Sequence, residues 1–381
     1  MVWRQSMEEK RRALAEAKEQ KRDEFYTRYE DVQEELNHYE EHFQGKTVFC
    51  NCDDPFESNF CKFFLKNFNY LGLKRLICTS YSTSSLIGQQ ISIFDENDEK
   101  VSPGNGYVMD IKEVPMKNGR GVSDDDILSL LASKKRGVKK LLDNGDFRSE
   151  ECIKYLKEAD IVVTNPPFSL FREYIAQLIE YEKKFIVLSN MNALSYKEIF
   201  PLIRDGKLWI GYGFNMSMIY KTPYKNKLEA NRKYVISKGY DPDEGYVKVP
   251  GICWLTNLDI EKRHEDLIMY RRFDETEYPK YANYPAINVD KVTDIPKDYE
   301  GFMGVPITFL DKFNPEQFEI IGLGITELGK AIGVGKYDRR YRTPASRDGT
   351  LYYVKDGKGV VPYARVLIKN KSPEKEIRNG D

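Results

Sequence analysis

One short stretch constrains this chain more than any other. An apolar strand, Asp160-Ile-Val-Val-Thr164, runs directly into Asn165-Pro166-Pro167-Phe168, and a helical pattern follows. The two prolines fix φ and remove two N–H donors, so the chain makes a rigid turn where the strand ends. In an open α/β sheet such a turn lies at the carboxyl edge, where ligands bind. The turn therefore presents the Asn165 amide, the Pro166 carbonyl and the Phe168 ring together.

This set of groups suits a planar amine. Asn165 Oδ1 and the Pro166 carbonyl can accept hydrogen bonds from an exocyclic NH₂ group, while Phe168 stacks on the ring that carries it. The structural alternative is a proline turn that ends a strand and buries a core Phe. The strand before the turn and the helix after it favour the functional interpretation.

Short apolar strands alternate with amphipathic helices over the first two thirds of the chain. The predicted strands cover residues 46–50, 74–80, 160–164, 184–189, 208–212 and 251–256. Helical patterns cover residues 31–42, 60–68 and 171–181. This alternation predicts an α/β protein with a mostly parallel sheet flanked by helices. After about residue 257 the alternation stops, and strands at 303–310 and 318–323 indicate a second, smaller domain.

The composition excludes several classes of protein. In 381 residues there are 59 Lys and Arg against 60 Asp and Glu, so the net charge of −1 neither favours nor disfavours a nucleic-acid partner. The sequence contains no apolar run of membrane length and no secretory h-region, which predicts a cytoplasmic protein without a membrane partner. Six Cys residues do not form a disulfide framework, and three His residues argue against zinc. We therefore expect a reduced, metal-free chain.

Further motifs accompany the proline turn in a fixed order. They are Asp23-Glu-Phe-Tyr-Thr27, Cys50-Asn-Cys-Asp-Asp-Pro55 with Ser58-Asn-Phe60, and Gly145-Asp-Phe-Arg148. The turn itself resembles the signature of AdoMet-dependent amino-methyltransferases, which is Asn, Asp or Ser, then Pro-Pro, then an aromatic residue. The whole set, over roughly residues 20–325, resembles the EcoRI-type adenine-specific DNA methyltransferases. Ser58 and Phe60 replace the glycines of the common methyltransferase loop, a form that the EcoRI type shares.

The resemblance implies a Rossmann-like AdoMet-dependent methyltransferase fold with a smaller C-terminal target-recognition domain. The expected organisation is a charged N-terminal helix over residues 1–22 and a methyltransferase domain over 23–260, with an insertion near 213–250. A DNA target-recognition region over 261–381 would follow.

The resemblance also implies the site residues. The expected catalytic residues are Asn165, Pro166, Pro167 and Phe168. The expected contacts to S-adenosyl-L-methionine are Phe25, Tyr26, Thr27, Asp53, Asp54, Pro55, Ser58, Asp146 and Phe147. Asp53 and Asp54 can accept hydrogen bonds from the ammonium group or the ribose hydroxyls, and Asp146 from the cofactor's adenine N6. For Asp53, Asp54 and Asp146 the alternative is a solvated turn.

The implied activity is methyl transfer from S-adenosylmethionine to N6 of an adenine in a specific DNA sequence. The adenine must be flipped out of the duplex, because N6 cannot be reached inside it. Such an enzyme is the modification half of a restriction-modification system, and its partner would be a cognate restriction endonuclease that acts separately. Neither a metal nor a membrane is implied.

Basic residues gather where double-stranded DNA would bind. Residues 336–371 hold ten Lys or Arg against three Asp, a local charge of +7, with tyrosines between them. The expected DNA contacts are Lys336, Arg339, Arg340, Arg342 and Arg347. The insertion between 221 and 248 is also basic, with seven Lys or Arg against four acids. The alternative is that both are ordinary solvated surfaces.

Other functions stay open from the residues alone. The same acceptor pair suits an RNA adenine or a protein glutamine, although Phe168 disfavours the glutamine enzymes, which usually carry Tyr there. A catalytically inactive DNA-binding protein with a methyltransferase-like fold is a further alternative. A nicotinamide dehydrogenase is disfavoured because no G-x-G-x-x-G motif follows the first strand.

Overall fold

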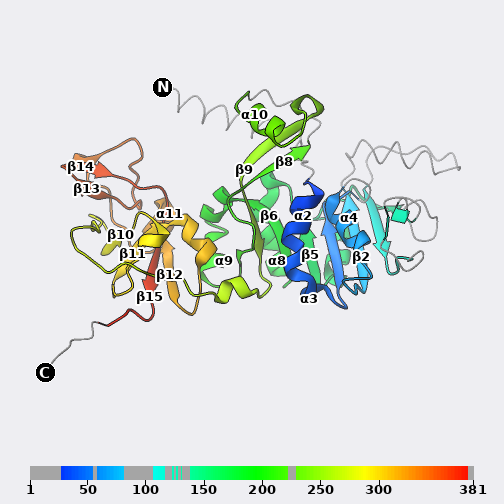
Figure 1. Ribbon diagram of the computed structural model, residues 1–381, viewed down its shortest axis with the longest axis horizontal. Helices are drawn as coiled ribbons and strands as arrows, with labels where there is room; N and C mark the ends of the chain where they lie inside the picture. Colours follow the sequence, from blue (N-terminus) through cyan, green and yellow to red (C-terminus); the bar gives the residue numbers. More distant parts are fainter. Residues whose placement is uncertain are drawn as a thin grey trace. The chain divides into compact units, whose positions relative to one another are not determined.

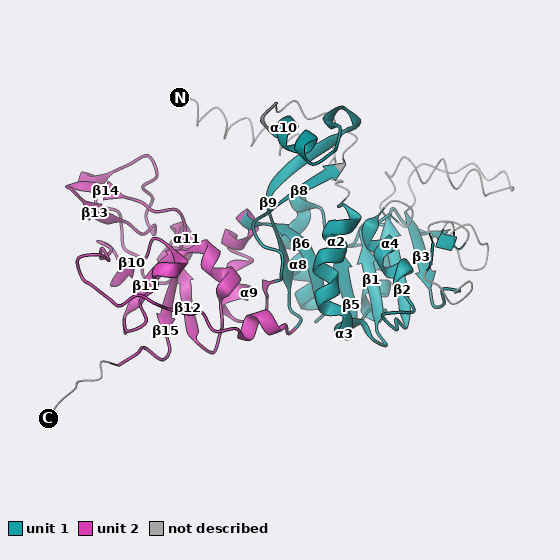
Figure 2. Cartoon of the chain, in the orientation of Figure 1, with its two compact units in different colours: residues 1–191, 211–258 teal, residues 192–210, 259–381 magenta. Residues whose placement is uncertain are grey.

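The computed structural model divides into two compact units, coloured separately in Figure 2. Unit 1 comprises residues 1–191 and 211–258, and unit 2 comprises residues 192–210 and 259–381. The structure describes residues 27–54, 58–80, 106–115, 122–123, 126–127, 130, 138–221 and 229–375 (Figure 1). The predicted N-terminal helix over 1–22 lies outside the described residues.

A twisted central sheet organises unit 1. Its strands run in the order β4-β3-β2-β1-β5-β6-β9. They are β1 Thr47–Asn51, β2 Arg75–Ser80, β3 Tyr107–Ile111, β4 Val138–Lys140, β5 Ile161–Thr164, β6 Lys184–Asn190 and β9 Tyr246–Thr256. The four central strands, β2, β1, β5 and β6, are parallel, whereas β3, β4 and β9 are antiparallel to their neighbours. The predicted α/β class and mostly parallel sheet are confirmed.

The sheet changes winding direction between β1 and β5. From β1 the chain proceeds first to β2 on one side, and later returns to place β5 on the other side. In open α/β sheets, the carboxyl ends of the strands at such a switch point bound the ligand crevice. The loop after β1 and the turn after β5 therefore meet at one edge of the sheet.

Helices pack on the sheet through apolar faces. They are α2 Tyr29–Leu36, α3 Glu40–Phe43, α4 Asn59–Lys66, α7 Glu150–Glu158 and α8 Phe171–Glu180, covering the sheet as Figure 1 shows. In α8 the buried residues Phe171, Tyr174, Ile175 and Leu178 recur at helical spacing. α4 begins at Ser58, whose hydroxyl accepts from the Phe60 N–H. The predicted helix over 31–42 is interrupted by a 3-10 turn, η1 Asn37–Tyr39.

The polar insertion of unit 1 forms a hairpin and a helix. β8 Met216–Lys221 pairs with the first half of β9, and α10 Glu229–Ser237 lies between them in the sequence. Figure 1 shows this arm extending from the sheet.

Unit 2 contains a separate four-stranded sheet. Its order is β10-β11-β15-β12, with β10 Ala286–Asn288, β11 Phe302–Pro306, β12 Phe318–Leu323 and β15 Arg365–Asn370. The short segment α9 Phe200–Arg204 and the helix α11 Thr326–Ala331 also belong to this unit, as does the hairpin of β13 Tyr353–Lys355 and β14 Lys358–Val360. The predicted strand over 303–310 is wrong beyond Pro306, because the chain continues as the 3-10 helix η7 Ile307–Lys312.

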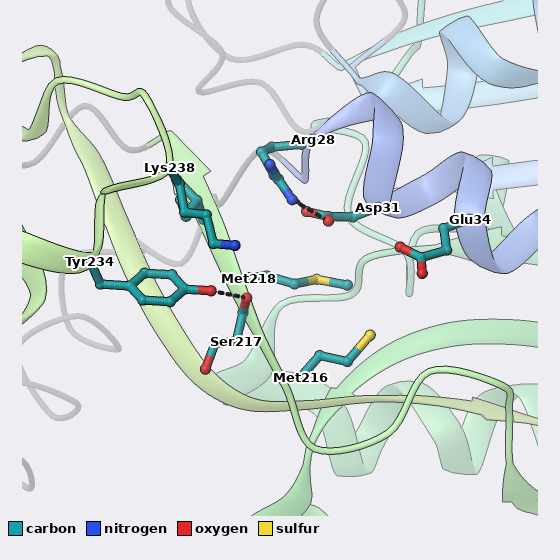
Figure 3. Close-up of a pocket in the computed structure, with 9 residues that line it drawn as sticks. Arg28, Asp31, Glu34, Met216, Ser217, Met218, Tyr234 and Lys238 are labelled. Atoms are coloured by element: carbon teal, nitrogen blue, oxygen red, sulfur yellow. Dashed lines mark hydrogen bonds and ion pairs between the residues drawn. The ribbon is translucent and has the colours of Figure 1, made fainter. Parts of the chain in front are cut away.

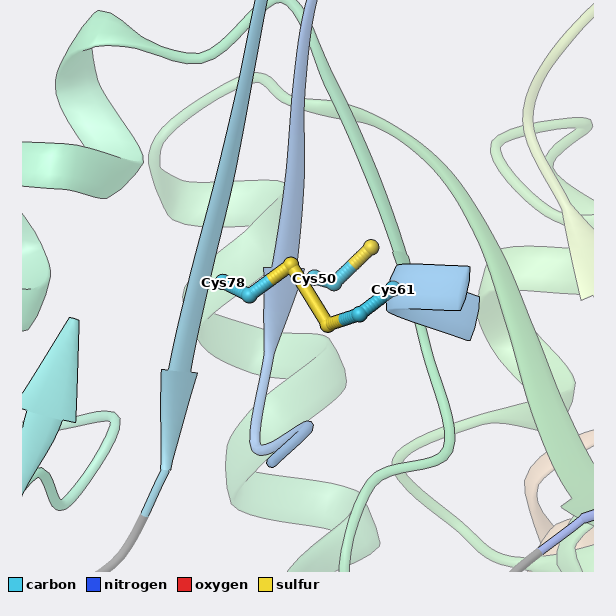
Figure 4. A group of neighbouring side chains, drawn as sticks. All are labelled: Cys50, Cys61 and Cys78. Atoms are coloured by element: carbon cyan, nitrogen blue, oxygen red, sulfur yellow. A yellow bond between two sulfur atoms is a disulfide. The ribbon is translucent and has the colours of Figure 1, made fainter. Parts of the chain in front are cut away.

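A disulfide corrects the expectation of a fully reduced chain. Cys61 on α4 and Cys78 on β2 are bonded, with their Cα atoms 6.6 Å apart. Cys50 on β1 lies beside them, and all three side chains are buried (Figure 4). The sequence does not reveal this pairing, because the contact depends on how α4 packs over the neighbouring strands.

None of the helices within the described ranges is long and apolar enough to cross a membrane.

Candidate active site

The loop after β1 carries two adjacent acids, and the carboxyl group of Asp53 faces inward. Asp53 is 6% exposed. Its Oδ1 accepts a 2.7 Å hydrogen bond from the Ser58 hydroxyl, and its Oδ2 accepts a 2.5 Å bond from the Thr164 hydroxyl. The Asn165 backbone N–H also donates to this carboxyl group. Asp53 thus joins the β1 loop, the start of α4 and the turn after β5.

Burial controls the charge of this acid. Desolvation raises the pKa of Asp53 from its ordinary value near 3.8 to about 7, although the bonds from Thr164, Ser58 and Asn165 lower it. The neighbouring Asp54 is equally buried. Burial, and then the charge of Asp54, raise the pKa of Tyr107 at the start of β3. Two carboxyl groups that are buried from water at the carboxyl edge of the sheet form a site that favours a cationic ligand.

The proline turn lies where the sequence analysis expects it. Pro166 is buried, whereas Asn165 and Phe168 are half-buried at the carboxyl end of β5. Asn165 Nδ2 lies 3.4 Å from the Thr27 hydroxyl, and Asn59 on α4 donates to the Thr27 carbonyl at 2.7 Å. The structure thus brings Thr27, Asp53, Ser58 and Asn165 together from distant parts of the sequence. Phe25, Tyr26 and Pro55 lie outside the described residues.

A second loop, residues 143–148, reaches the same edge beside β2. Gly145 has a φ of +73°, and a Cβ there would lie 2.1 Å from the Ser80 carbonyl oxygen, so only glycine allows this approach. Asp146 forms an ion pair with Arg148 at 2.7 Å. Phe147 is buried against Tyr174, with the ring centroids 5.0 Å apart. Phe147 therefore supports the loop from within, while Asp146 is half-buried.

Two buried polar atoms at this edge fit a polar ligand. The Ser80 hydroxyl, at the end of β2, and Asn51 Nδ2, at the end of β1, have no hydrogen-bond partner within the described part of the chain. Buried polar groups are ordinarily satisfied, by protein, water or ligand. The hydroxyl and the amide would suit the ribose or amino-acid groups of a nucleoside cofactor. The sequence does not single out Asn51, because a polar residue that ends a strand is not distinctive.

A buried carboxylate anchors the helix that precedes the site. Glu35 of α2 is 3% exposed and accepts hydrogen bonds from the Tyr39 hydroxyl at 2.8 Å and from the backbone N–H groups of Tyr212 and Gly213 at 2.9 and 2.6 Å. This contact fixes α2, and with it Thr27, against residues 211–213. The sequence does not single out Glu35, because an acid among other charges in a helix is typical of a solvent-exposed surface.

A cavity of about 240 Å³ opens beside the N-terminus of α2 (Figure 3). Its lining is mixed: β8 contributes Met216 and Met218, while Glu34 and Lys238 add charged groups. Arg28, which is bonded to Asp31, also lines it and directly follows Thr27. One residue of the cavity lining, Arg28, is therefore the sequence neighbour of Thr27, which contacts Asn165.

The predicted DNA-contact residues lie in unit 2, on a loop with an ordered framework. The rings of Tyr337 and Tyr352 pack at a tilt with their centroids 4.0 Å apart, and the Tyr337 hydroxyl donates to the Tyr341 carbonyl. All five predicted basic residues, Lys336, Arg339, Arg340, Arg342 and Arg347, are exposed. Arg340 pairs with Asp338, and Arg347 donates to backbone carbonyls. Within the described residues, Lys336, Arg339 and Arg342 form no ion pair. The tyrosines therefore build the loop, and three of its cations are available to a ligand.

Comparison with known proteins decides the family. The model of the family described as adenine-specific methyltransferase EcoRI matches residues 13–371. The chain is also 43% identical, over 95% of its length and 97% of the relative's, to the Type II methyltransferase M.EcoRI of Escherichia coli. The chain belongs to the EcoRI adenine-specific methyltransferase family. The resemblance that the motifs indicate is confirmed, and the protein is an adenine-specific methyltransferase.

Two further relatives of this chain come from mycoplasmas. The Type II methyltransferase M.MpnI of Mycoplasma pneumoniae is 38% identical over 80% of this chain and 83% of its own length. The Type II methyltransferase M.MgeORF184P of Mycoplasma genitalium is 36% identical over 80% of this chain and 84% of its own length. No solved structure matches this member of the EcoRI family.

Proposed function

We propose that this EcoRI-family enzyme transfers a methyl group from S-adenosylmethionine to N6 of a flipped-out adenine in a specific sequence of duplex DNA. The observation that carries the proposal is the proline turn at the switch point of the sheet, with Asn165 beside Thr27 and above the buried Asp53. The enzyme would act in the cytoplasm as the modification half of a restriction-modification system. A cognate endonuclease would act separately.

The groups around the carboxyl edge fit S-adenosylmethionine. Asp54 would favour its cationic end, and Thr27 would contact its carboxylate. Ser80 and Asn51 offer unsatisfied polar atoms for its hydroxyl or amino groups. Asp146, which is half-buried, would accept a hydrogen bond from the adenine N6 of the cofactor. When bound, the cofactor supplies a methyl group activated by a positively charged sulfur.

The turn would prepare the target nitrogen for attack. Adenine N6 is a poor nucleophile because its lone pair is delocalised into the ring. Two acceptors placed out of the ring plane, Asn165 Oδ1 and the Pro166 carbonyl, would hold the two N6 hydrogens and localise that lone pair. The positive charge that develops on N6 meets these fixed dipoles, which need no reorganisation during the reaction. Stacking on Phe168 would offset part of the cost of removing the adenine from the duplex.

Basic side chains would hold the DNA by contacting its phosphate backbone. Lys336, Arg339 and Arg342 are exposed on the loop of unit 2 and can contact phosphates or base edges. In unit 1, Lys248 lies 4.0 Å from the ring of Tyr234, near the cavity beside α2. This pair offers a cation and an aromatic face to a nucleotide, in a part of the arm that the sequence analysis identifies as basic.

The direct test measures methyl transfer to duplex DNA, RNA and protein with labelled S-adenosylmethionine. We expect label in DNA alone, recovered as N6-methyladenine, and a loss of about 1,000-fold in rate for Asn165→Ala. Phe168→Ala should lose roughly 10- to 100-fold. Cofactor binding, measured by calorimetry, should persist in both variants. Tyr70→Ala, at a residue that is 74% exposed, serves as the matched aromatic control. Label in RNA or protein, or full activity of Asn165→Ala, would refute the proposal.

A further inference from the structure

The buried carboxyl group of Asp53 is surrounded by donors that belong to the catalytic turn and its support. Thr164 is the last residue of β5, and Asn165 is the first residue of the turn. Both donate to Asp53, through a hydroxyl at 2.5 Å and a backbone N–H respectively. Ser58 donates to the other oxygen at 2.7 Å. A residue that served only the cofactor would have no need of contacts on the strand that carries Asn165.

We propose that Asp53 is a positioning residue for methyl transfer, whose ionised carboxylate fixes Thr164 and the Asn165 backbone and thereby sets where the Asn165 side-chain amide lies. The inference rests on the proposed function, since it assigns the acceptor role to Asn165. Asp53 touches no reacting atom in this scheme. It acts through the turn, which must hold its acceptors to within a fraction of an ångström of the target nitrogen.

Thr164 supplies the reason that the charge of Asp53 matters. Its hydroxyl lies within hydrogen-bonding reach of both Asp53 Oδ2 and the Asn51 carbonyl oxygen, but it has one hydrogen to donate. An ionised Asp53 is the stronger acceptor and draws that hydrogen to itself. A protonated Asp53 donates its own hydrogen to Thr164, and Thr164 then turns to Asn51. Protonation of Asp53 therefore changes the hydrogen-bond acceptor of Thr164, the residue directly before Asn165.

The other groups that face Asp53 keep this exchange within an accessible pH range. Asp54, on the same loop, opposes its ionisation. Cys50 on β1 and Tyr174 on α8 also lie near it, and burial raises the pKa of both well above ordinary values, so they remain neutral. Cys61 on α4 contacts the Asp53 backbone carbonyl. With these surroundings the pKa of Asp53 rises to about 7.

The experiment compares Asp53→Asn, Thr164→Val and Asp54→Asn in the full-length enzyme, measuring kcat for DNA methylation and Kd for S-adenosylmethionine. We expect Asp53→Asn to lower kcat by roughly 10- to 100-fold with Kd changed less than about threefold, and Thr164→Val to lower kcat in the same sense. Asp54→Asn should instead raise Kd. A raised Kd with normal kcat in Asp53→Asn would assign Asp53 to the cofactor and overturn the inference.

The pH profile separates positioning from simple structural support. In the wild type, kcat should fall as the pH drops through about 7, as Asp53 becomes protonated. This limb should move to higher pH in Thr164→Val, which lacks one donor to the carboxylate, and disappear in Asp53→Asn. If Asp53→Asn does not fold, an unshifted limb and normal kcat in Thr164→Val overturn the inference. A wild type inactive on DNA would overturn the proposed function, whereas an active wild type with a fully active Asp53→Asn overturns the inference alone.

Discussion

Gly145 shows how one residue can set the shape of the carboxyl edge of the sheet. Its φ of +73° and its approach to the Ser80 carbonyl oxygen leave no room for a side chain. Gly145→Ala should push residues 143–148 away from β2 and raise the Kd for S-adenosylmethionine by about 10-fold or more, measured by calorimetry. Gly45→Ala is the matched control, because Gly45 has a φ of +70° with open space around it. Equal effects in the two variants would mean that backbone conformation alone is responsible.

The raised pKa of Asp53 also predicts how stability depends on pH. The folded protein binds the Asp53 proton more tightly than the unfolded chain, so this residue favours folding most below pH 4 and loses that contribution as the pH rises through about 7. Relative to the wild type, Asp53→Asn should gain stability between pH 5 and pH 8, by about 3 kcal/mol. Urea unfolding at these two pH values measures the difference. A pH-independent difference would contradict the raised pKa.

The proline turn lies where the sequence predicts it, whereas the side chains that contact it could not be predicted. We propose roles for Asn165 and Phe168 because two adjacent prolines after an apolar strand are chemically specific. Thr164 looks like any β-branched strand residue, and Ser80 like any polar strand end. Their roles depend on which atoms the neighbouring strands bring within hydrogen-bonding distance, and residue type does not encode that.

At the scale of elements, the Glu35 carboxylate joins α2 to the segment after residue 210 through hydrogen bonds. Glu35→Ala would remove this acceptor from the half-buried N–H groups of Tyr212 and Gly213, and should lower the free energy of unfolding by roughly 2–5 kcal/mol. Glu35→Gln keeps one acceptor oxygen and should cost less. Urea unfolding checks both. Exposed Glu30 at the start of α2 provides the control, and an Ala change there should stay within about 0.5 kcal/mol.

The buried central strands could be predicted from the sequence, but the edge strand β4 and the end of β11 could not. β1, β2, β5 and β6 have apolar centres, as strands covered on both faces require. β4 is mostly exposed and only three residues long, so it carries no periodic pattern. η7 follows Pro306 because proline cannot donate to a β-ladder, and the strand ends there.

At the scale of the molecule, a net charge of −1 requires that affinity for DNA come from local charge. Arg339→Ala and Arg342→Ala should each reduce the slope of log affinity against log salt by about 1, as loss of one phosphate contact does. Arg340→Ala is the matched control, because Arg340 is already paired with Asp338. Titration of labelled duplex DNA at several salt concentrations measures the slopes. Unchanged slopes for Arg339 and Arg342 would exclude this loop from the DNA contact.

The two units are interleaved along the chain, which has a consequence for synthesis. Residues 192–210 belong to unit 2, yet unit 1 resumes at residue 211, so no single cut separates the two. On the ribosome, α9 emerges with the apolar side chains of Phe200 and Ile203, whereas β12, the strand that contacts α9, begins only at Phe318. A nascent chain released early would carry an uncovered apolar helix, a feature that chaperones and proteases recognise.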